Sequence, residues 1–334
     1  MISRCKPSRP GWRTGPWRRS AAALLLAAGP ALALPSYQDV RRSFVPSDLP
    51  LLDRHGTPIH TVRVDTTVRR GAWLGLDEVS PALRQALVLS EDRRFWAHGG
   101  VDWQALAASA WANAWNTRTR GASTLTMQLA GLLQDDIARP ASGRSVGQKL
   151  TQMARAQQLE SSWTKAQILE AYLNHVPLRG ELVGVAAASQ VLFGKVASGL
   201  DSTEAAVLAV MVRGPNANAA TLERRACEVL RQQRLGCAPL AITISQALAR
   251  RPGALRNDSG EAIAPHLAQH IAQRMAQAAA PRGAAPPLAL QSTLDARVQR
   301  TALAALRRQL AELRGRDVED GAVLVLDNAS GEVL

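Results

Sequence analysis

The chain has 334 residues, with 40 Lys and Arg against 27 Asp and Glu, which gives a formal net charge of +13. Hydrophobic residues make up 46% of the sequence, a share that fits a globular protein with a full core and argues against disorder. A basic surface suits anionic lipid, a pyrophosphate or nucleic acid, and nucleic acid is the weakest candidate because no zinc finger, RNA-binding signature or dense Lys/Arg block is present.

Residues 1–36 have the pattern of an export signal. A basic flank precedes an uncharged apolar run from Ala21 to Leu34. The run is short for a spanning helix, which needs about 20 residues, and is typical of a signal peptide. A cleaved signal and an uncleaved anchor both fit this pattern. In either case the positive flank places the rest of the chain outside the cytoplasm.

A hairpin and a helix are predicted next. Residues 49–70 alternate in polarity around a turn, which predicts a short β-hairpin. Ser80 followed by Pro81 is typical of an N-cap and the first position of a helix, and this helix is expected to end near Glu91. Its inward-facing residues are expected to be Leu83, Leu87 and Val88.

Three tryptophans follow at helical spacing among alanines, namely Trp103, Trp111 and Trp115. A Trp stripe is most often part of a core. Tryptophan is also enriched where a protein touches a membrane interface. Both interpretations remain open from the sequence.

The rest of the chain is predicted to be mainly helical up to a Pro- and Gly-rich linker at residues 281–287. The segment from Asp201 to Glu204 has the capping-box pattern that opens a helix. After the linker we expect a helix at 296–314, then a strand at 322–327 and a turn at 328–331. The other predicted helices span 145–160, 164–174, 221–235, 240–250 and 262–279.

The chain has three cysteines. Cys227 and Cys237 are close enough in sequence to form a disulfide, and an exported location would permit one. Two unpaired thiols are the favoured interpretation. Cys5 precedes the apolar run.

Two segments carry a family resemblance. The run from Glu91 to Asp102 and the run from Gly121 to Gln128 resemble the first two motifs of the peptidoglycan glycosyltransferases, glycosyltransferase family 51. The residue sequence of the second run is similar to that of the branch called penicillin-binding protein 1C. Later segments resemble the remaining three motifs and lie at 148–160, 165–174 and 204–209.

The resemblance implies a mainly α, lysozyme-like glycosyltransferase domain with a small N-terminal β-hairpin. Such an enzyme polymerises lipid II, and this reaction needs a base, positive groups for the leaving pyrophosphate and a groove that aligns two substrates. Glu91 is the implied catalytic base, and Asp92 and His98 are implied to orient it. Polar residues of the second motif are implied to line the cleft near the sugar-phosphate, and these are Ser123, Thr124 and Gln128.

The third motif is implied to bind the pyrophosphate. Its implied substrate-binding residues are Arg144, Lys149, Gln152, Arg155 and Glu160. Gln152 stands where the family has a glutamate, Gln148 stands where it has an arginine, and Gly131 stands where many members have a lysine. A neutral amide holds a divalent ion poorly, so no cofactor is firmly implied and a role for Mg²⁺ is doubtful.

The resemblance also implies a division of the chain. The expected parts are a basic flank with a signal or anchor at 1–36, the glycosyltransferase domain at 45–225, a helical linker region at 226–290 and a partial α/β start of a transpeptidase domain at 291–334. Ser162 and Lys165 fit the Ser-x-x-Lys pattern of penicillin-binding nucleophiles. They lie at the start of the fourth glycosyltransferase motif, which Lys165 opens, so we expect no complete transpeptidase.

The implied partners are lipid II, the growing glycan strand, the inner membrane and other wall-synthesis proteins, with the catalytic domain on the periplasmic side of a single-pass anchor. Two rival functions fit the same sequence. One is a lytic, lysozyme-like enzyme that cleaves finished glycan. The other is a weakly active or non-catalytic scaffold, an interpretation that Gln152 and Gly131 favour.

Overall fold

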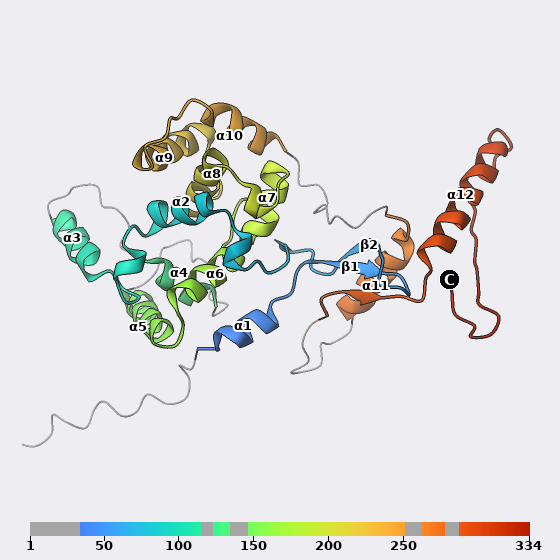
Figure 1. The fold of residues 1–334 in the computed structure, drawn as a ribbon, viewed down its shortest axis with the longest axis horizontal. Coiled ribbons are helices and arrows are strands. Elements are labelled where there is room, and N and C mark those ends of the chain that lie inside the picture. The colour runs from blue at the N-terminus through green and yellow to red at the C-terminus, as the bar shows by residue number, and fades with distance from the viewer. Residues whose placement is uncertain (1–33, 115–122, 134–145, 251–261, 278–286) are drawn as a thin grey trace, which may run out of the picture. The chain divides into compact units, whose positions relative to one another are not determined.

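The structure is a computed structural model that describes residues 34–114, 123–133, 146–250, 262–277 and 287–334 (Figure 1). Helices dominate these residues, so the predicted mainly α class is confirmed. The helices are α1 (Tyr37–Ser43), α2 (Pro81–Glu91), α3 (Trp103–Ala114), α4 (Leu125–Leu132), α5 (Val146–Ser162), α6 (Lys165–His175), α7 (Gly184–Phe193), α8 (Ser202–Arg213), α9 (Ala219–Gln232), α10 (Leu240–Ala249), α11 (Pro265–Gln277) and α12 (Ala296–Glu312). The strands are β1 (Asp48–Leu52), β2 (Pro58–Arg63), β3 (Arg69–Arg70), β4 (Leu182–Val183) and β5 (Leu290–Gln291).

Helix α8 is the centre of the helical core. Residues 205–212 are all buried, as expected of a helix that is apolar on every side. The helix packs against α2 and α9 (Figure 1). Its start confirms the predicted capping box, because Asp201 accepts hydrogen bonds from the backbone of Thr203 and Glu204.

Helix α2 begins and ends where its sequence predicts. Ser80 accepts a hydrogen bond from Leu83 N at 3.0 Å, and Pro81 occupies the first turn. Leu83, Leu87 and Val88 are buried against the core, as predicted. The helix ends at Glu91, so its C-terminal residue is held by a capped and packed element.

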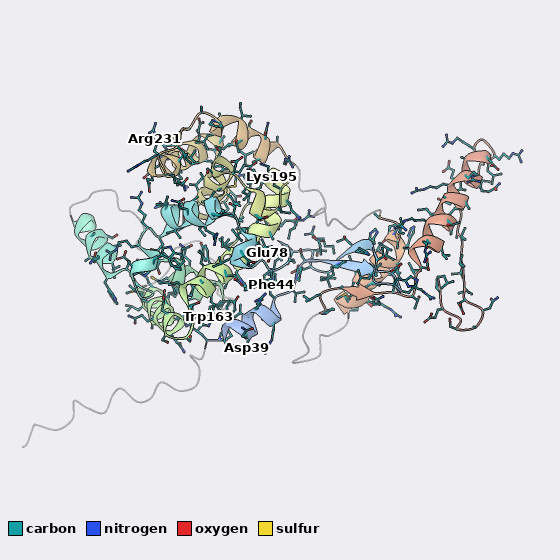
Figure 2. The ribbon with its side chains drawn as sticks, in the orientation of Figure 1. Asp39, Phe44, Glu78, Trp163, Lys195 and Arg231 are labelled. Atoms are coloured by element: carbon teal, nitrogen blue, oxygen red, sulfur yellow. A yellow bond between two sulfur atoms is a disulfide. The ribbon has the colours of Figure 1, made fainter. Side chains whose placement is uncertain are left out.

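Helix α1 is held by an aromatic cluster next to α6. Tyr37 lies edge-on to Trp163, with ring centroids 5.4 Å apart, and Phe44 lies edge-on to Trp73 at 5.1 Å. Phe44 and Trp163 are labelled in Figure 2. The Tyr37 hydroxyl donates a hydrogen bond to Glu170, which also accepts one from Trp73 Nε1. These contacts fix the start of the described chain against the helical core.

The predicted hairpin is confirmed, and it has additional partners from the other end of the chain. Strands β1 and β2 pair antiparallel, and β5 adds to β1 in parallel. Helix α11 packs on β2. The shared hydrophobic core combines both segments and consists of Leu51, Ile59, Val62, Ile263, Ala264, Ala268, Leu294 and Ala296.

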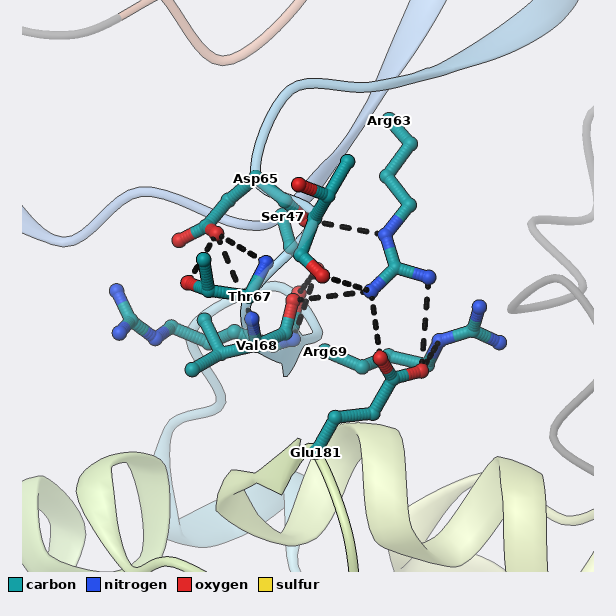
Figure 3. A network of polar contacts seen from close by, with 9 residues as sticks. Ser47, Arg63, Asp65, Thr67, Val68, Arg69 and Glu181 are labelled. Atoms are coloured by element: carbon teal, nitrogen blue, oxygen red, sulfur yellow. Dashed lines mark hydrogen bonds and ion pairs between the residues drawn. The ribbon is translucent and has the colours of Figure 1, made fainter.

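An ion-pair network connects β2 and β3 with the turn before β4. Glu181 lies 2.9 Å from Arg63 Nη2 and 3.1 Å from Arg69 Nε (Figure 3). Arg63, followed by Arg69, holds the pKa of Glu181 below its ordinary value. Ser47 binds the same segment, because its hydroxyl oxygen accepts a hydrogen bond from Arg70 N in β3 at 2.8 Å.

The predicted strand at 322–327 is wrong. The structure gives this segment an isolated bridge between Leu326 and Val333, and Val323 and Leu324 are exposed. A strand needs a partner along its length, and the described residues supply this segment with none beyond that bridge. The turn that follows is confirmed, since Asp327 accepts hydrogen bonds from the backbone of residues 329 and 330.

Other predictions can be checked only where the structure describes the chain. The helices predicted at 145–160, 164–174, 221–235, 240–250, 262–279 and 296–314 correspond to α5, α6, α9, α10, α11 and α12. The export signal lies outside the described residues except for its end, and the linker lies outside them except for Pro287. Within the described ranges, no helix has the length and apolar content to cross a membrane.

The favoured unpaired state of the cysteines is wrong. Cys227 and Cys237 form a disulfide with their Cα atoms 5.2 Å apart. Helix α9 ends at Gln232, and the chain then reverses through Arg234, which has a positive φ of 62°. This reversal returns Cys237 to the side of Cys227, a closeness that the sequence spacing permits but does not require.

Removing this disulfide should lower the stability of the fold. Closing a loop of this length stabilises a protein by roughly 2–3 kcal/mol through the unfolded state. We expect the double variant Cys227→Ser, Cys237→Ser to lose that amount in urea unfolding. Dithiothreitol should destabilise the wild type equally and leave the variant unchanged. Equal sensitivity of both proteins to dithiothreitol would contradict the assignment.

Candidate active site

A pocket of about 430 Å³ lies where the ends of α2, α4, α8 and α9 meet. It is lined by residues of the first motif (91–102) and of the second motif (121–128), which are separate segments of the sequence. From the candidates named above it is lined by Glu91, Asp92, Ser123, Thr124 and Gln128. The structure therefore places these five predicted residues around one cavity.

Glu91 is half-buried at the end of α2 and is held by two neutral donors. Gln128 Nε2 donates to one carboxylate oxygen at 3.3 Å, and the Ser90 hydroxyl donates to the other at 3.1 Å. Burial raises the pKa of Glu91 above its ordinary value, and the two hydrogen bonds and the charges of Arg213 and Arg225 oppose the rise. A carboxylate with a raised pKa is a stronger base than an exposed one.

Tyr172 fixes the orientation of Gln128. Its hydroxyl donates to Gln128 Oε1 at 2.7 Å, which leaves the amide nitrogen facing Glu91. Tyr172 is fully buried on α6, so the amide is anchored from the core. Tyr172 was not among the site residues predicted from the sequence. The signal available was a Tyr hydroxyl on an otherwise apolar helix face.

Asp92 joins the first motif to the second. His98 Nε2 lies 2.9 and 3.0 Å from its two carboxylate oxygens, and Leu125 N donates to it at 3.0 Å. Both side chains are almost completely buried. Because Leu125 is the first residue of α4, this network sets the helix that carries Gln128 against the residue that follows Glu91.

Thr124 and Gly100 complete the junction of the two motifs. Thr124 caps α4 by accepting a hydrogen bond from Met127 N at 3.1 Å, and its hydroxyl donates to Gly100 O at 2.5 Å. Gly100 has a φ of +82°, and a Cβ there would lie 2.7 Å from Ala156 O. This close approach requires glycine and brings the first motif against α5.

The third-motif candidates do not line this pocket in the described part of the chain. Lys149 is exposed on α5, and Arg155 is half-buried with its Nε unpartnered among the described residues. Glu160 accepts hydrogen bonds from Thr126 at 2.7 Å and Lys165 at 2.6 Å. Arg144 lies outside the described residues.

Gln152 and Gly131, both departures from the family pattern, are neighbours in the structure. A Cβ on Gly131 would lie 2.8 Å from Gln152 Nε2. The glycine therefore makes room for the amide between α4 and α5. In the described ranges, no cluster of three or more His, Cys, Asp or Glu residues could hold a metal ion.

The tryptophan stripe is only partly described. Trp103 is 56% exposed, so the core interpretation is wrong for this residue. Trp96, from the first motif, is 60% exposed. The side chains of Trp111 and Trp115 lie outside the described set. The interpretation of this stretch as a membrane-interface face stays a prediction.

Ser162 and Lys165 bind different partners. The Ser162 hydroxyl donates to the carbonyl oxygen of Gln158 at 3.1 Å, within its own helix. Lys165 Nζ reaches Glu160 and lies 4.4 Å from the centroid of the Phe95 ring. Ser162 is therefore an exposed residue bonded within α5, whereas Lys165 connects α6 with Glu160 and Phe95.

Comparison with known proteins places these motifs in a family. The family model described as Transglycosylase matches residues 55–234. Penicillin-binding protein 1C of Escherichia coli (strain K12) is 40% identical over 150 residues, which cover 44% of this chain and 19% of that protein. The biosynthetic peptidoglycan transglycosylase of Rhodospirillum centenum is 35% identical over 202 residues, covering 54% of this chain and 83% of that protein.

A third relative, the biosynthetic peptidoglycan transglycosylase of Pasteurella multocida, is 35% identical over 168 residues that cover 49% of this chain and 66% of that protein. The chain thus spans about a fifth of penicillin-binding protein 1C and most of the Rhodospirillum protein. The matched family region contains Glu91 and every residue named above that surrounds it.

Proposed function

Because this chain belongs to the transglycosylase family, we propose that it polymerises lipid II into β-1,4 glycan strands and releases undecaprenyl pyrophosphate. The observation that supports this most strongly is the position of Glu91. It is a half-buried carboxylate with a raised pKa, held by Gln128 and Ser90 at the wall of a pocket that both motifs build.

In the proposed reaction Glu91 removes the proton from the acceptor 4-hydroxyl. The acceptor oxygen then attacks C1 of the donor sugar, and the C1–oxygen bond to the pyrophosphate breaks with inversion. The electron pair leaves with the pyrophosphate, where positive side chains stabilise it. Gln128 and Ser90 hold the two carboxylate oxygens in place, which limits the reorganisation needed in the transition state.

Lys149, Arg144 and Arg155 are the proposed third-motif cations for the leaving group. Gln152, in the family's glutamate position, can donate and accept hydrogen bonds but carries no charge for a divalent ion. The proposed mechanism therefore assigns charge stabilisation to side chains. A Gln152→Glu variant should make the rate more dependent on Mg²⁺ than the wild type is.

We further propose that residues 1–36 hold the chain at the inner membrane, with the remainder on the periplasmic side. The basic flank and apolar run support this placement. Residues 45–225 are proposed as the glycosyltransferase domain, 226–290 as a helical linker region and 291–334 as the start of a transpeptidase domain. The β1–β2 hairpin contacts residues of these later segments through the shared core described above.

The fall of kcat/KM at low pH should reflect the protonation of Glu91. The base must be ionised, so kcat/KM should fall as pH drops through its pKa, and burial raises that pKa above the ordinary value of a glutamate. Gln128→Ala removes a hydrogen bond that favours the ionised form. We expect the fall of kcat/KM to occur at higher pH in this variant. A fall in kcat/KM that does not shift to higher pH in Gln128→Ala would contradict this role.

A product assay separates the proposed function from its rivals. Purified protein is given fluorescent lipid II in one reaction and finished sacculi in another. A polymerase makes long strands from lipid II and leaves sacculi intact. Release of fragments from sacculi would favour the lytic enzyme, and no change in either substrate by a folded protein would favour the scaffold.

A further inference from the structure

Two arginines that the motif comparison does not assign lie on the wall of the Glu91 pocket formed by α8 and α9. Arg213 is the last residue of α8, and Arg225 lies in the middle of α9. They belong to one corner of the pocket. A Cβ on Gly214 would lie 3.0 Å from Arg225 Nη1, so the Arg225 guanidinium sits over the turn that directly follows Arg213.

The other charges on the pocket wall have partners. Arg93 lies 3.6 Å from Glu228, and Arg94 lies 3.5 Å from Asp102. Asp92 is engaged by His98, as described above.

These pairings leave Glu91 with two guanidinium groups, Arg213 and Arg225. Neither arginine makes an ion pair or a side-chain hydrogen bond in the described part of the chain, although both lie near enough to influence the Glu91 carboxylate. The pocket lining holds four arginines and four carboxylates, and two of the arginines, Arg213 and Arg225, have no carboxylate within ion-pair distance in the described part of the chain. Two guanidinium groups without an ion-pair partner at one corner of a pocket suit an anionic ligand.

We propose that Arg213 and Arg225 together bind a phosphate of the pyrophosphate-linked sugar substrate. Guanidinium groups present planar pairs of donors that match phosphate oxygens. Arg225 is half-buried, which strengthens its interaction with an anion relative to an exposed side chain. This inference rests on the proposed function, since it assigns the anion to the substrate of that reaction.

Binding of inorganic pyrophosphate to the purified chain tests this site without requiring turnover. Titration calorimetry would compare the wild type with Arg213→Gln and Arg225→Gln, and thermal melting would establish that each variant is folded. Each variant should bind pyrophosphate about tenfold more weakly, the effect of one lost charge-assisted contact. Arg213→Lys keeps the charge and should recover part of the affinity.

Arg231→Gln is the matched control, because Arg231 is exposed on the same helix and is absent from the pocket lining (Figure 2). It should leave pyrophosphate affinity within twofold of the wild type. No binding to the wild type, unchanged affinity in both pocket variants, or an equal loss in the control would overturn the proposal.

A second measurement separates this proposal from the proposed function. If lipid II is not polymerised but pyrophosphate binding depends on Arg213 and Arg225, the anion site stands and the reaction assignment fails. If lipid II is polymerised and the two variants keep wild-type pyrophosphate affinity, the reaction assignment stands and the anion site is wrong.

Discussion

Replacing Glu91 with Gln should lower the rate of lipid II polymerisation by about 10²–10⁴-fold, the usual contribution of a general base. The substitution keeps the size of the side chain and an oxygen that can accept from Gln128 or Ser90. It removes the group that takes the proton. A time course of strand formation under saturating lipid II measures the effect on kcat.

The fold should tolerate this change. Burial raises the pKa of Glu91, so the folded state disfavours the ionised carboxylate relative to the unfolded state. The stability contributed by the carboxyl group therefore falls as pH rises through the raised pKa, and a neutral Gln avoids this cost at pH 7. Melting of Glu91→Gln at or above the wild-type temperature is expected. A variant that keeps more than about a tenth of the activity would refute the base assignment.

Replacing Asp92 with Ala should destabilise the fold by about 3 kcal/mol, as expected when the shared acceptor of two buried hydrogen-bond donors is removed. The change leaves His98 and the backbone N–H of Leu125 without their shared acceptor. Helix α4 then loses the contact that sets Gln128 opposite Glu91. Urea unfolding measures the stability, and strand formation well below the melting temperature measures the activity.

Two further variants identify the origin of that effect. Asp77→Ala removes an exposed carboxylate and should change the stability by less than about 0.5 kcal/mol. Asp92→Asn retains an acceptor for Leu125 N and should recover part of both stability and kcat. If Asp92→Ala were as stable as Asp77→Ala, the network would not hold the two motifs together.

Local signals predicted much of the fold. Ser80 and Pro81 define the start of α2, and the Asp201–Glu204 capping box defines the start of α8, because caps depend on residues three positions apart. The length of α2 then places Glu91 at a helix end. The hairpin was predictable for the same reason, since its alternation and turn lie within one short segment.

Contacts between distant segments were not predictable in this way. Nothing near Leu290 in the sequence indicates that β5 pairs with β1, and nothing near Tyr172 indicates that its hydroxyl orients Gln128. The disulfide depended on the reversal of the chain after α9. A strand at 322–327 was predicted from its apolar residues alone, but a strand also requires a partner.

Some residues of the site could be predicted from the sequence and others could not, for a related reason. Motif residues such as Gln128 could be assigned from their neighbours in the sequence. Arg213 was not among the predicted site residues, because its place in the Glu91 pocket depends on how α8 packs against α2. Glu160 matched the third motif, yet in the structure its carboxylate is engaged by Thr126 and Lys165.

The most direct test of the central claim is the stoichiometry and linkage of the products formed from lipid II by purified residues 36–334. We predict one undecaprenyl pyrophosphate released for each disaccharide added, β-1,4 linkages in the strands and loss of both products in Glu91→Gln. Release of the pyrophosphate lipid without strand growth, or strand growth that persists in Glu91→Gln, would contradict the claim that Glu91 activates an acceptor sugar in this pocket.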